Sequence, residues 1–543
     1  MTLYMGHEIS QSNSYHIQPL TRIHLYSGVD YSIQTGSDIN QIYMLIIIAF
    51  LILSIACLNF MNLSTARSLE RRMEVGIRKA FGAQRLQIVR QFLIESILIS
   101  NIALIFAVFF SEMLLPSFNE LVIRRLQFDW TLLPHMIGLS ILVGIGAGIY
   151  PSLLLSAFGP IEAVKNIPKT RLSGERLRKG LTVLQFSISD LFIISSAVVY
   201  QQLQYLNSRD LGLDQNQVLN LWVFTRNQDL RKNPNVIKER FLQHSDIQSA
   251  SVVYGWGIDR PYASTIRPEG TGQTQTMYYL DGDEDLVATY GFDLIAGRNL
   301  RKDAENEFLV NETAIQHFGW AEPIGKQIEW IDQERTGTIV GVVKDFYYKS
   351  FQSTIDPLFI GKWLEPSQLI LKINSDNIPE TLTFIEEKWK EMVPTAAFSY
   401  RFLDSHIEQF YREIRRTNEF AYISSILSIF LACMGLFGLV SFMTEKQTKE
   451  IGIRKTLGAS VTDILVLFAA NFTKLILISG LAACPMAYYI MSDWLQDFAY
   501  RIELGYGVFL FGIGSTLIIA LLTVVLQVYK AAAANPVDVL RVE

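Results

Sequence analysis

Two nearly identical ten-residue stretches hold the residues best suited to specific binding. EVGIRKAFGA occupies residues 74–83 and EIGIRKTLGA occupies residues 450–459, and seven of the ten positions are identical. In both stretches one carboxylate, an Arg-Lys pair and two glycines follow the same order: Glu74, Gly76, Arg78, Lys79 and Gly82, and then Glu450, Gly452, Arg454, Lys455 and Gly458. These charges can form ion pairs with another protein. The repetition of the same order suggests a binding surface.

A basic stretch beside a membrane span has a simpler explanation, because Lys and Arg in cytoplasmic loops set the orientation of the spans. That explanation requires net positive charge, but it does not require the same ten residues twice. The duplication therefore favours a second interpretation, in which each stretch is a docking surface for a partner protein.

The rest of the chain shows no motif typical of a catalytic or metal site. No G-x-x-x-x-G-K-[ST] sequence is present, and the spacings in GIRKTLG and GERLRKG do not suit a phosphate loop. The seven histidines are scattered, no H-E-x-x-H sequence occurs, and the three cysteines lie inside apolar runs. The sequence therefore predicts no enzyme activity, cofactor, metal or disulfide framework in this chain.

One ionisable residue, Asp190, falls near the middle of the apolar run 182–203, with Ser187 three residues before it. A carboxyl at that depth is costly and usually faces a bundle interior or water. It could belong to a polar seam between two halves or to a relay, but a hydrogen-bonded packing role is the stronger expectation. Asn59 and Asn62 are expected to bond between helices.

The elements that position these residues are membrane helices. Half of the residues are apolar and 18% are charged, and a bilayer core about 30 Å thick requires about 20 apolar residues in a helix. No signal peptide is recognisable at the start of the chain. Seven stretches are long and apolar enough to span: 42–63, 93–115, 132–156, 182–203, 420–443, 466–491 and 507–528.

The distribution of Lys and Arg predicts the orientation of these spans. The loops 64–92, 157–181 and 444–465 are rich in Lys and Arg, whereas the short loops on the other side hold three arginines. The positive-inside rule places the basic loops in the cytoplasm. The N-terminus and the segment 204–419 are then periplasmic, and the C-terminus is cytoplasmic.

The segment 204–419 has the mixed composition of a folded α+β domain. Alternating and β-branched patterns predict strands at VLNLWV, IQSASVVYGW, TGTIVGVV and LILKI. Helical periodicity predicts helices at DEDLVATYG, ETAIQHF and PETLTFIEEKWKEM. The sequence therefore predicts an α-helical polytopic membrane protein with an extracytoplasmic α+β domain.

The repeat is longer than ten residues. A single constant shift along the chain carries Glu74 onto Glu450 and Pro160 onto Pro536 without a gap, so that GPIEAVKN lies on NPVDVLRV. The match in register therefore extends from the ten-residue stretch through two spans to this tail, and both copies have the same topology. Such duplication is common in transporters, where two pseudo-symmetric halves surround a pathway.

Each ten-residue stretch is expected to form a short helix, at 74–81 and 450–457. Its glutamate lies in the first turn and its cations in the last, as the helix dipole favours. Gly82 and Gly458 suit a left-handed stop, and the S-x-x-D sequence at 460–463 suits a cap for the next helix. One apolar face is expected to comprise three positions in each copy: Val75, Ile77 and Phe81, and Ile451, Ile453 and Leu457.

The repeated stretches, the tails PIEAVK and NPVDVLR and the external domain between two spans together resemble the FtsX-like/MacB-like permease family of ABC transporters. GFDLIAGRNL and GTIVGVVKDFYYKSF also resemble the MacB-like periplasmic core domain of that family. The resemblance covers nearly the whole chain. The departure from the family pattern is the lack of a first span and of most of a first external domain.

The resemblance implies that a cytoplasmic ABC ATPase dimer, in separate chains, binds ATP and Mg²⁺ beneath the permease. The elbow formed by each ten-residue stretch would dock in a groove of one ATPase. Its glycines would allow close helix approach, and its charges would orient docking. The remaining expectations are a bacterial inner membrane location, contact with the lipid bilayer, no nucleic acid, and a periplasmic adaptor or hydrolase left open as a further partner.

The expected order of parts follows from the shift and the resemblance: a remnant of a first periplasmic domain at 1–41, a first FtsX-like unit at 42–166, a linker and span at 167–203, a periplasmic MacB-like core domain at 204–419 and a second FtsX-like unit at 420–543. The first half is interpreted as N-terminally shortened. A chain that natively begins here is the alternative.

The leading functional hypothesis is a permease that couples cytoplasmic ATP hydrolysis to periplasmic movement, for export or extraction of a peptide, antibiotic, lipid or lipoprotein. A second hypothesis is a signalling protein that transmits the same movement to a periplasmic hydrolase or reports an antibiotic. A secondary transporter, for which Asp190 is weak support, and a defective fragment are the remaining alternatives.

Overall fold

The fold is taken from a computed structural model of the chain. It describes residues 19, 39–67, 71–122, 126–157, 171–222, 234–253, 258, 261–348, 353–362, 368–392, 394 and 397–533. The remnant expected at 1–41 lies outside these residues except for Pro19 and Ile39–Gln41. The tails at 159–166 and 535–542 lie outside them entirely.

The chain divides into two compact units. The first, called the membrane unit, comprises Met1–Ser196, Phe420–Ala487 and Tyr506–Glu543. The second, called the external unit, comprises Ala197–Glu419 and Tyr488–Gly505. The short segment 488–505 therefore belongs to the external unit, although it joins two membrane helices.

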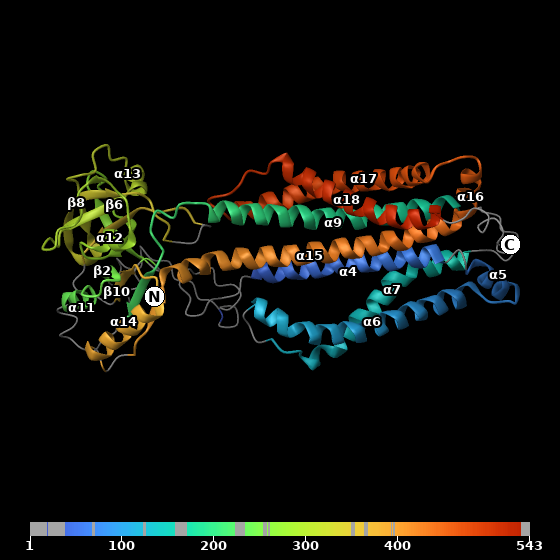
Figure 1. Ribbon diagram of the computed structural model, residues 1–543, viewed down its shortest axis with the longest axis horizontal. Helices are drawn as coiled ribbons and strands as arrows, with labels where there is room; N and C mark the ends of the chain where they lie inside the picture. The colour runs from blue at the N-terminus through green and yellow to red at the C-terminus, as the bar shows by residue number, and fades with distance from the viewer. Residues whose placement is uncertain are drawn as a thin grey trace. The chain divides into compact units, whose positions relative to one another are not determined.

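Seven helices in the described part of the chain are long and apolar enough to cross a membrane, which confirms the predicted spans. They are α4 (Ile39–Arg67), α6 (Arg85–Val122), α7 (Leu133–Ala157), α9 (Arg171–Asn207), α15 (Leu403–Lys446), α17 (Val461–Gln496) and α18 (Tyr506–Ala533). Within the membrane unit, α4, α9 and α15 run side by side (Figure 1), joined by a cluster that includes Ile55, Ile188 and Leu431.

Four of these helices, α6, α9, α15 and α17, extend well beyond the predicted spans. The helix α15 has 44 residues and begins at Leu403, although the apolar run begins at residue 420. No glycine or proline interrupts the intervening residues, so nothing in the sequence ends the helix at the edge of the apolar run. The helices α9, α15 and α17 each contribute residues to both units.

The external unit contains two sheets. The smaller has the order β11-β1-β10-β2 and is antiparallel. Its strands are β1 (Val218–Trp222), β2 (Ile247–Val253), β10 (Gln368–Ile373) and β11 (Tyr400–Phe402). The helices α11 (Pro234–Phe241) and α14 (Ile378–Met392) pack on it through a core that includes Phe241 and Trp389.

The larger sheet has the order β5-β8-β6-β9-β4-β3-β7 and mixes parallel and antiparallel pairs. Its strands are β3 (Tyr262–Pro268), β4 (Gln275–Asp281), β5 (Leu294–Gly297), β6 (Glu307–Asn311), β7 (Gln327–Trp330), β8 (Arg335–Val343) and β9 (Leu358–Gly361). The helices α12 (Leu286–Tyr290) and α13 (Glu312–Phe318) complete the domain. All the strands and helices predicted for this domain are present, which confirms the α+β expectation.

Glu307 begins the strand β6 and is 5% exposed. Arg298 donates to both of its carboxylate oxygens, at 2.6 and 2.8 Å, and Arg301 Nε donates at 2.8 Å. The bonds from Arg298, together with those from Arg301, lower the pKa of Glu307 to about 2, against burial, which raises it. Glu307 therefore holds the segment that contains Arg298 and Arg301 against the strand β6.

We expect Glu307→Gln to destabilise the external unit by about 2 kcal/mol at pH 7, because buried bonds to a charged group are lost. The folded pKa lies below the ordinary value of 4.5. This stabilisation is therefore complete above about pH 4.5 and disappears as the pH falls towards 2. Thermal unfolding of the full chain at pH 7 and pH 3 measures it.

The control for this prediction is Glu305→Gln, because Glu305 is exposed and meets only one arginine, at 3.3 Å. Equal unfolding temperatures for the Glu307→Gln and Glu305→Gln variants at pH 7 would contradict the assigned role of Glu307.

Candidate functional site

The two ten-residue stretches form the same structure in both repeats. The first lies on the helix α5 (Arg72–Ala80) and the second on α16 (Thr448–Thr456), each nine residues long. The two helices start and end at equivalent positions of the repeat, under the shift found in the sequence. Each begins two residues earlier than predicted, and Phe81 and Leu457 are their C-caps.

Each elbow helix ends in a Schellman motif, in which two backbone bonds close the last turn around a left-handed residue. Gly82 has a φ of +93°, its N–H donates to Lys79 O, and Ala83 N–H donates to Arg78 O, both at 3.0 Å. In the second copy Gly458 has a φ of +98° and the two equivalent bonds measure 3.0 and 2.9 Å.

The backbone conformation, rather than space, requires glycine at both stops. A Cβ added to Gly82 or Gly458 would meet no atom within 4 Å, but a side chain is strained at this φ. The expected close helix approach is therefore not found within this chain at these two positions. Gly76 and Gly452, by contrast, are buried inside their helices.

The helix after each stop begins with matching caps. Ser460 N–H donates to Asp463 Oδ2 at 2.9 Å and Asp463 N–H donates to Ser460 Oγ at 3.2 Å, the reciprocal capping that the S-x-x-D sequence predicts. In the first copy Gln84 N–H donates to Gln87 Oε1 at 2.9 Å. Two different side-chain pairs thus fix the same turn between elbow and span.

The expectation of one apolar face on each elbow is wrong. Val75 is fully buried and Ile451 is 5% exposed, whereas Phe81 and Leu457 are 89% and 82% exposed. Helix residues two apart point about 200° from each other, so Ile77 lies opposite Val75, and Phe81 lies past the end of the helix as its C-cap. Each elbow therefore holds one apolar residue in the membrane unit and presents another at its tip.

The elbow charges remain accessible. Glu74 and Arg78 form an ion pair at 2.8 Å, and Glu450 and Arg454 form the equivalent pair at 2.6 Å. Their side chains are between 40% and 55% exposed. Exposed pairs one turn apart stabilise a helix by only about 0.3–0.5 kcal/mol. These four side chains are therefore paired within their own helices and still accessible to another protein.

Lys79 makes a contact within the chain, and its docking role stays a prediction. Its Nζ donates to Ser156 O at 2.7 Å, in the last turn of α7, and Arg85 Nε donates to Ser156 Oγ at 3.3 Å. Burial, and then the charge of Arg85, lower the pKa of Lys79. A cation at the C-terminus of a helix also complements its dipole. Lys79 therefore connects the first elbow to α7.

The start of the same elbow is connected to α6. Arg71 donates to both carboxylate oxygens of Glu95, each at 2.9 Å, and its guanidinium lies 5.6 Å from the ring centroid of Phe92. With the bond from Lys79 to α7, the first elbow is fixed to both helices that follow it. A displacement of the elbow would therefore displace these spans.

Asp190 is fully buried in α9. Its Oδ2 accepts from Ser479 Oγ at 3.1 Å, and Ser187 Oγ lies 3.2 Å from Ser479 O, so the polar contacts of α9 reach α17. Ser189 and Ser428 hydroxyls lie 2.9 Å apart and extend these contacts to α15. In the described part of the chain, the side-chain bond of Asp190 reaches Ser479 on α17, a helix of the second half. A place for Asp190 in a seam between the two halves stays a prediction.

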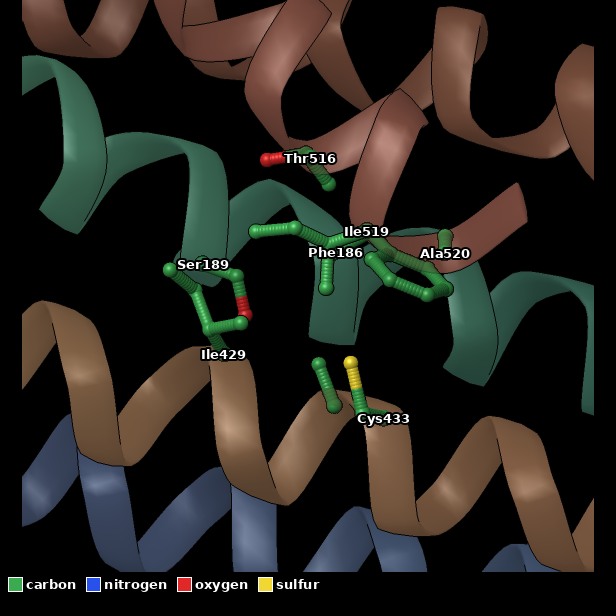
Figure 2. A pocket seen from close by; sticks show the side chains of 8 residues that line it. Phe186, Ser189, Ile429, Cys433, Thr516, Ile519 and Ala520 are labelled. Atoms are coloured by element: carbon green, nitrogen blue, oxygen red, sulfur yellow. The ribbon is translucent and has the colours of Figure 1, made fainter. Parts of the chain in front are cut away.

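A small cavity lies beside these polar contacts of α9 (Figure 2). Phe186 and Ser189 approach it from α9, and most of the remaining lining is apolar. The lining residues from α15 and α18 are Ile429, Ala432, Cys433, Thr516, Ile519 and Ala520. Its composition is that of helix packing rather than of a binding site for a charged ligand.

The fold and the elbows define a polytopic membrane protein with a duplicated three-helix unit. Residues 46–160 and 422–536 each match the family model described as the FtsX-like permease C-terminal domain. Both ends of the second match follow those of the first by the same shift that relates the two elbows. The chain therefore carries two FtsX-like permease domains, and its resemblance to the FtsX-like and MacB-like permeases of ABC transporters is confirmed.

Curated relatives match over one part of the chain. A macrolide export ATP-binding/permease protein MacB of Campylobacter jejuni is 33% identical over 122 residues, 22% of this chain and 18% of that protein. The ABC transporter permease YknZ of Bacillus subtilis is 29% identical over 123 residues, 22% of this chain and 30% of that protein. The chain thus spans less than a third of either relative.

Two solved structures are also similar. The periplasmic region of MacB from Actinobacillus actinomycetemcomitans is 16% identical, with a TM-score of 0.28 over 36% of this chain and 93% of that one. The extracellular domain of a YknZ transporter from Gram-positive bacteria is 11% identical, with a TM-score of 0.26 over 34% of this chain and 98% of that one.

Proposed function

We propose that this chain is the permease subunit of an ABC transporter whose ATPase subunits are separate chains, and that each elbow docks on one ATPase. The observation that supports the proposal most is the repetition of the elbow. Both copies have a nine-residue helix, a Schellman stop at glycine and an exposed apolar residue just before it. Two equal surfaces suit a partner that is a dimer.

The exposed tips are suited to protein binding. Phe81 and Leu457 occupy the same repeat position, on the side that the basic loops predict to be cytoplasmic, and both side chains are more than four-fifths exposed. Interface affinity is concentrated in a few apolar anchors that fill pockets and are surrounded by polar groups. Each elbow has one exposed apolar side chain at its tip and an exposed ion pair in the turn before it, as such an anchor requires.

The contacts of the elbow also support mechanical coupling. The first elbow is fixed to α6 through Arg71 and to α7 through Lys79. The helices α9, α15 and α17 continue from the membrane unit into the external unit without a break. Closure of an ATPase dimer could therefore be transmitted through continuous helices to the external domain.

We extend the proposal to the export or extraction of an amphiphile, which is a peptide, antibiotic, lipid or lipoprotein. The printed name of the Campylobacter jejuni relative assigns it macrolide export, and a macrolide is an amphiphile. Movement of an external domain beside a membrane suits substrates that partition into the bilayer surface.

Exchanging the charges of both elbow ion pairs tests the docking proposal. Glu74→Arg with Arg78→Glu, and Glu450→Arg with Arg454→Glu, keep an opposite-charge pair on each helix but reverse its direction. We expect at least a tenfold loss of affinity for an ATPase first identified by copurification with the unaltered chain, because charge complementarity orients docking. Titration of the purified ATPase onto the permease in nanodiscs measures it.

The matched control exchanges Arg267 and Glu329, an ion pair of the external unit with similar exposure. This exchange should leave the affinity unchanged. Equal affinity for the elbow exchange and the control exchange would show that the elbow charges do not orient docking.

A further inference from the structure

The two elbows share one pattern, but the residues around them differ in charge. Residues 71–95 hold six basic and two acidic side chains, whereas the equivalent residues 447–471 hold three basic and two acidic ones. The difference lies mainly in the turns directly after each glycine stop. There, Arg85 and Arg90 of the first copy are Val461 and Val466 in the second, and Gln87 is Asp463.

These positions lie beside each exposed tip. Arg85 and Arg90 are exposed in the first two turns of α6, and Arg85 follows the tip residue Phe81 by four positions. In the second copy Asp463 is exposed in the first turn of α17, where its carboxylate accepts from Ser460 N–H and Ser460 Oγ at 2.9 and 2.7 Å. An exposed aspartate is ionised at neutral pH. The surface after the first tip is therefore basic, whereas the surface after the second carries a negative charge.

The positive charge of the first surface is not balanced within the described part of the chain. There, neither Arg85 nor Arg90 forms an ion pair, and the bond of Arg85 goes to the uncharged hydroxyl of Ser156, at 3.3 Å. Burial, and then the charge of Arg85, lower the pKa of Lys79. Two cations thus repel each other at this surface. A partner that brings carboxylates would relieve the repulsion.

Phosphates of the lipid headgroups could also attract these arginines, and the two positions differ in this respect. Arg90 lies three residues before the apolar run 93–115, about 4.5 Å along the helix, so it can reach the headgroups. Arg85 lies eight residues before that run, about 12 Å along the helix. Its place beside the exposed Phe81 favours a protein partner over the lipid surface.

We propose that the two elbows dock with unequal strength, and that the groove that receives the first elbow has an acidic rim around an apolar pocket. This inference rests on the proposed function, because it concerns the same docking surface. The helices α5 and α16 lie at the same end of the membrane unit (Figure 1), so one ATPase dimer meets both elbows. Arg85 adds an attraction at the first groove, and Asp463 opposes it at the second. The first elbow is therefore the primary docking site.

Transfer of the charges from one elbow to the other tests this inference. Val461→Arg with Asp463→Gln gives the second elbow the charges of the first and keeps an S-x-x-Q cap. For the ATPase identified by copurification, we expect a gain in affinity of about fivefold or more at low ionic strength, and a similar loss for Arg85→Val. Both effects should shrink to about twofold or less in about 0.5 M salt, because salt screens exposed charges.

The matched control is Arg85→Lys, because lysine keeps the charge without the bond from Arg85 Nε to Ser156. This variant should bind the ATPase like the unaltered chain. The inference is overturned if Arg85→Lys loses as much affinity as Arg85→Val, or if the charge transfer brings no gain. Effects that occur in nanodiscs with anionic lipid but disappear in nanodiscs of phosphatidylcholine alone would overturn it in favour of a lipid partner.

The same titrations separate this inference from the proposed function. Absence of ATPase binding by the unaltered chain would overturn the proposed function. Binding by the unaltered chain, with no change in affinity in either charge variant, would overturn only the unequal docking.

Discussion

Replacing both Phe81 and Leu457 with aspartate is expected to abolish association with the partner ATPase and to remove its stimulation by the permease. The two side chains are 89% and 82% exposed, so the substitutions disturb no packing within the chain. If they fill pockets of the partner, a buried carboxylate replaces an apolar anchor at each site. Truncation of such an anchor alone costs about 2 kcal/mol or more, which corresponds to about a thirtyfold loss for each elbow.

The control for this prediction is Tyr506→Asp. Tyr506 is also 89% exposed, but it begins α18, in the loop that the sequence predicts to lie on the opposite side of the membrane. Binding and ATPase rate should be unchanged in this variant. The docking proposal fails if the elbow double variant binds the ATPase with the affinity of the Tyr506→Asp variant.

Replacing Gln202 with leucine is expected to release the segment 488–505 from the rest of the external unit. Gln202 lies on α9, is fully buried, and binds the backbone of this segment twice. Its Nε2 donates to Tyr500 O at 2.8 Å, and its Oε1 accepts from Ile502 N–H at 3.0 Å. Leucine fills similar volume but leaves both backbone groups without a partner. Each unpaired buried group costs about 1–3 kcal/mol.

The neighbouring contacts of this segment are aromatic. The ring of Tyr500 lies 5.2 Å from that of Tyr347 and 5.1 Å from the guanidinium of Arg209, and Phe498 belongs to the main core of the external unit. These contacts position the segment, and within the described residues Gln202 is the partner of both Tyr500 O and Ile502 N–H. Hydrogen exchange at Ile502 should therefore accelerate by at least tenfold in the Gln202→Leu variant.

The chain offers a closely matched control on the same helix. Gln204 lies two residues further along, and its amide bonds only the hydroxyl of Tyr200, at 3.1 Å, on the exposed side. Gln204→Leu should leave exchange at Ile502 unchanged. Equal exchange in both variants would remove the assigned role of Gln202 in joining the α17–α18 connection to the external domain.

The sequence predicted the spans well because length and hydropathy are properties of single segments. It could not predict where α15 begins, since residues 403–419 are polar and helix-forming without being apolar. The sequence predicted the strands β1, β2, β8 and β10 but missed β3, β4, β5, β6, β7, β9 and β11. The strands β6 and β9 are fully buried, so no alternation of apolar and polar residues marks them.

At the elbow, the sequence predicted what is local and missed what is tertiary. The glycine stops and the Ser460–Asp463 cap follow from residue type and spacing, and both are present. The bond from Lys79 to the end of α7 joins residues 77 positions apart, and no local pattern signals it. The bond between helices expected of Asn59 is present, but its acceptor, Leu431 O, lies 372 positions away and no local pattern signals it.

The most direct test of the central claim, that both elbows dock on an ATPase, is a photo-activated cross-linker placed singly at positions 81, 457 and 506. We expect cross-links to the ATPase from positions 81 and 457 in the assembled complex, and none from position 506. A result without cross-links from 81 and 457, or with equal cross-linking from 506, would contradict it.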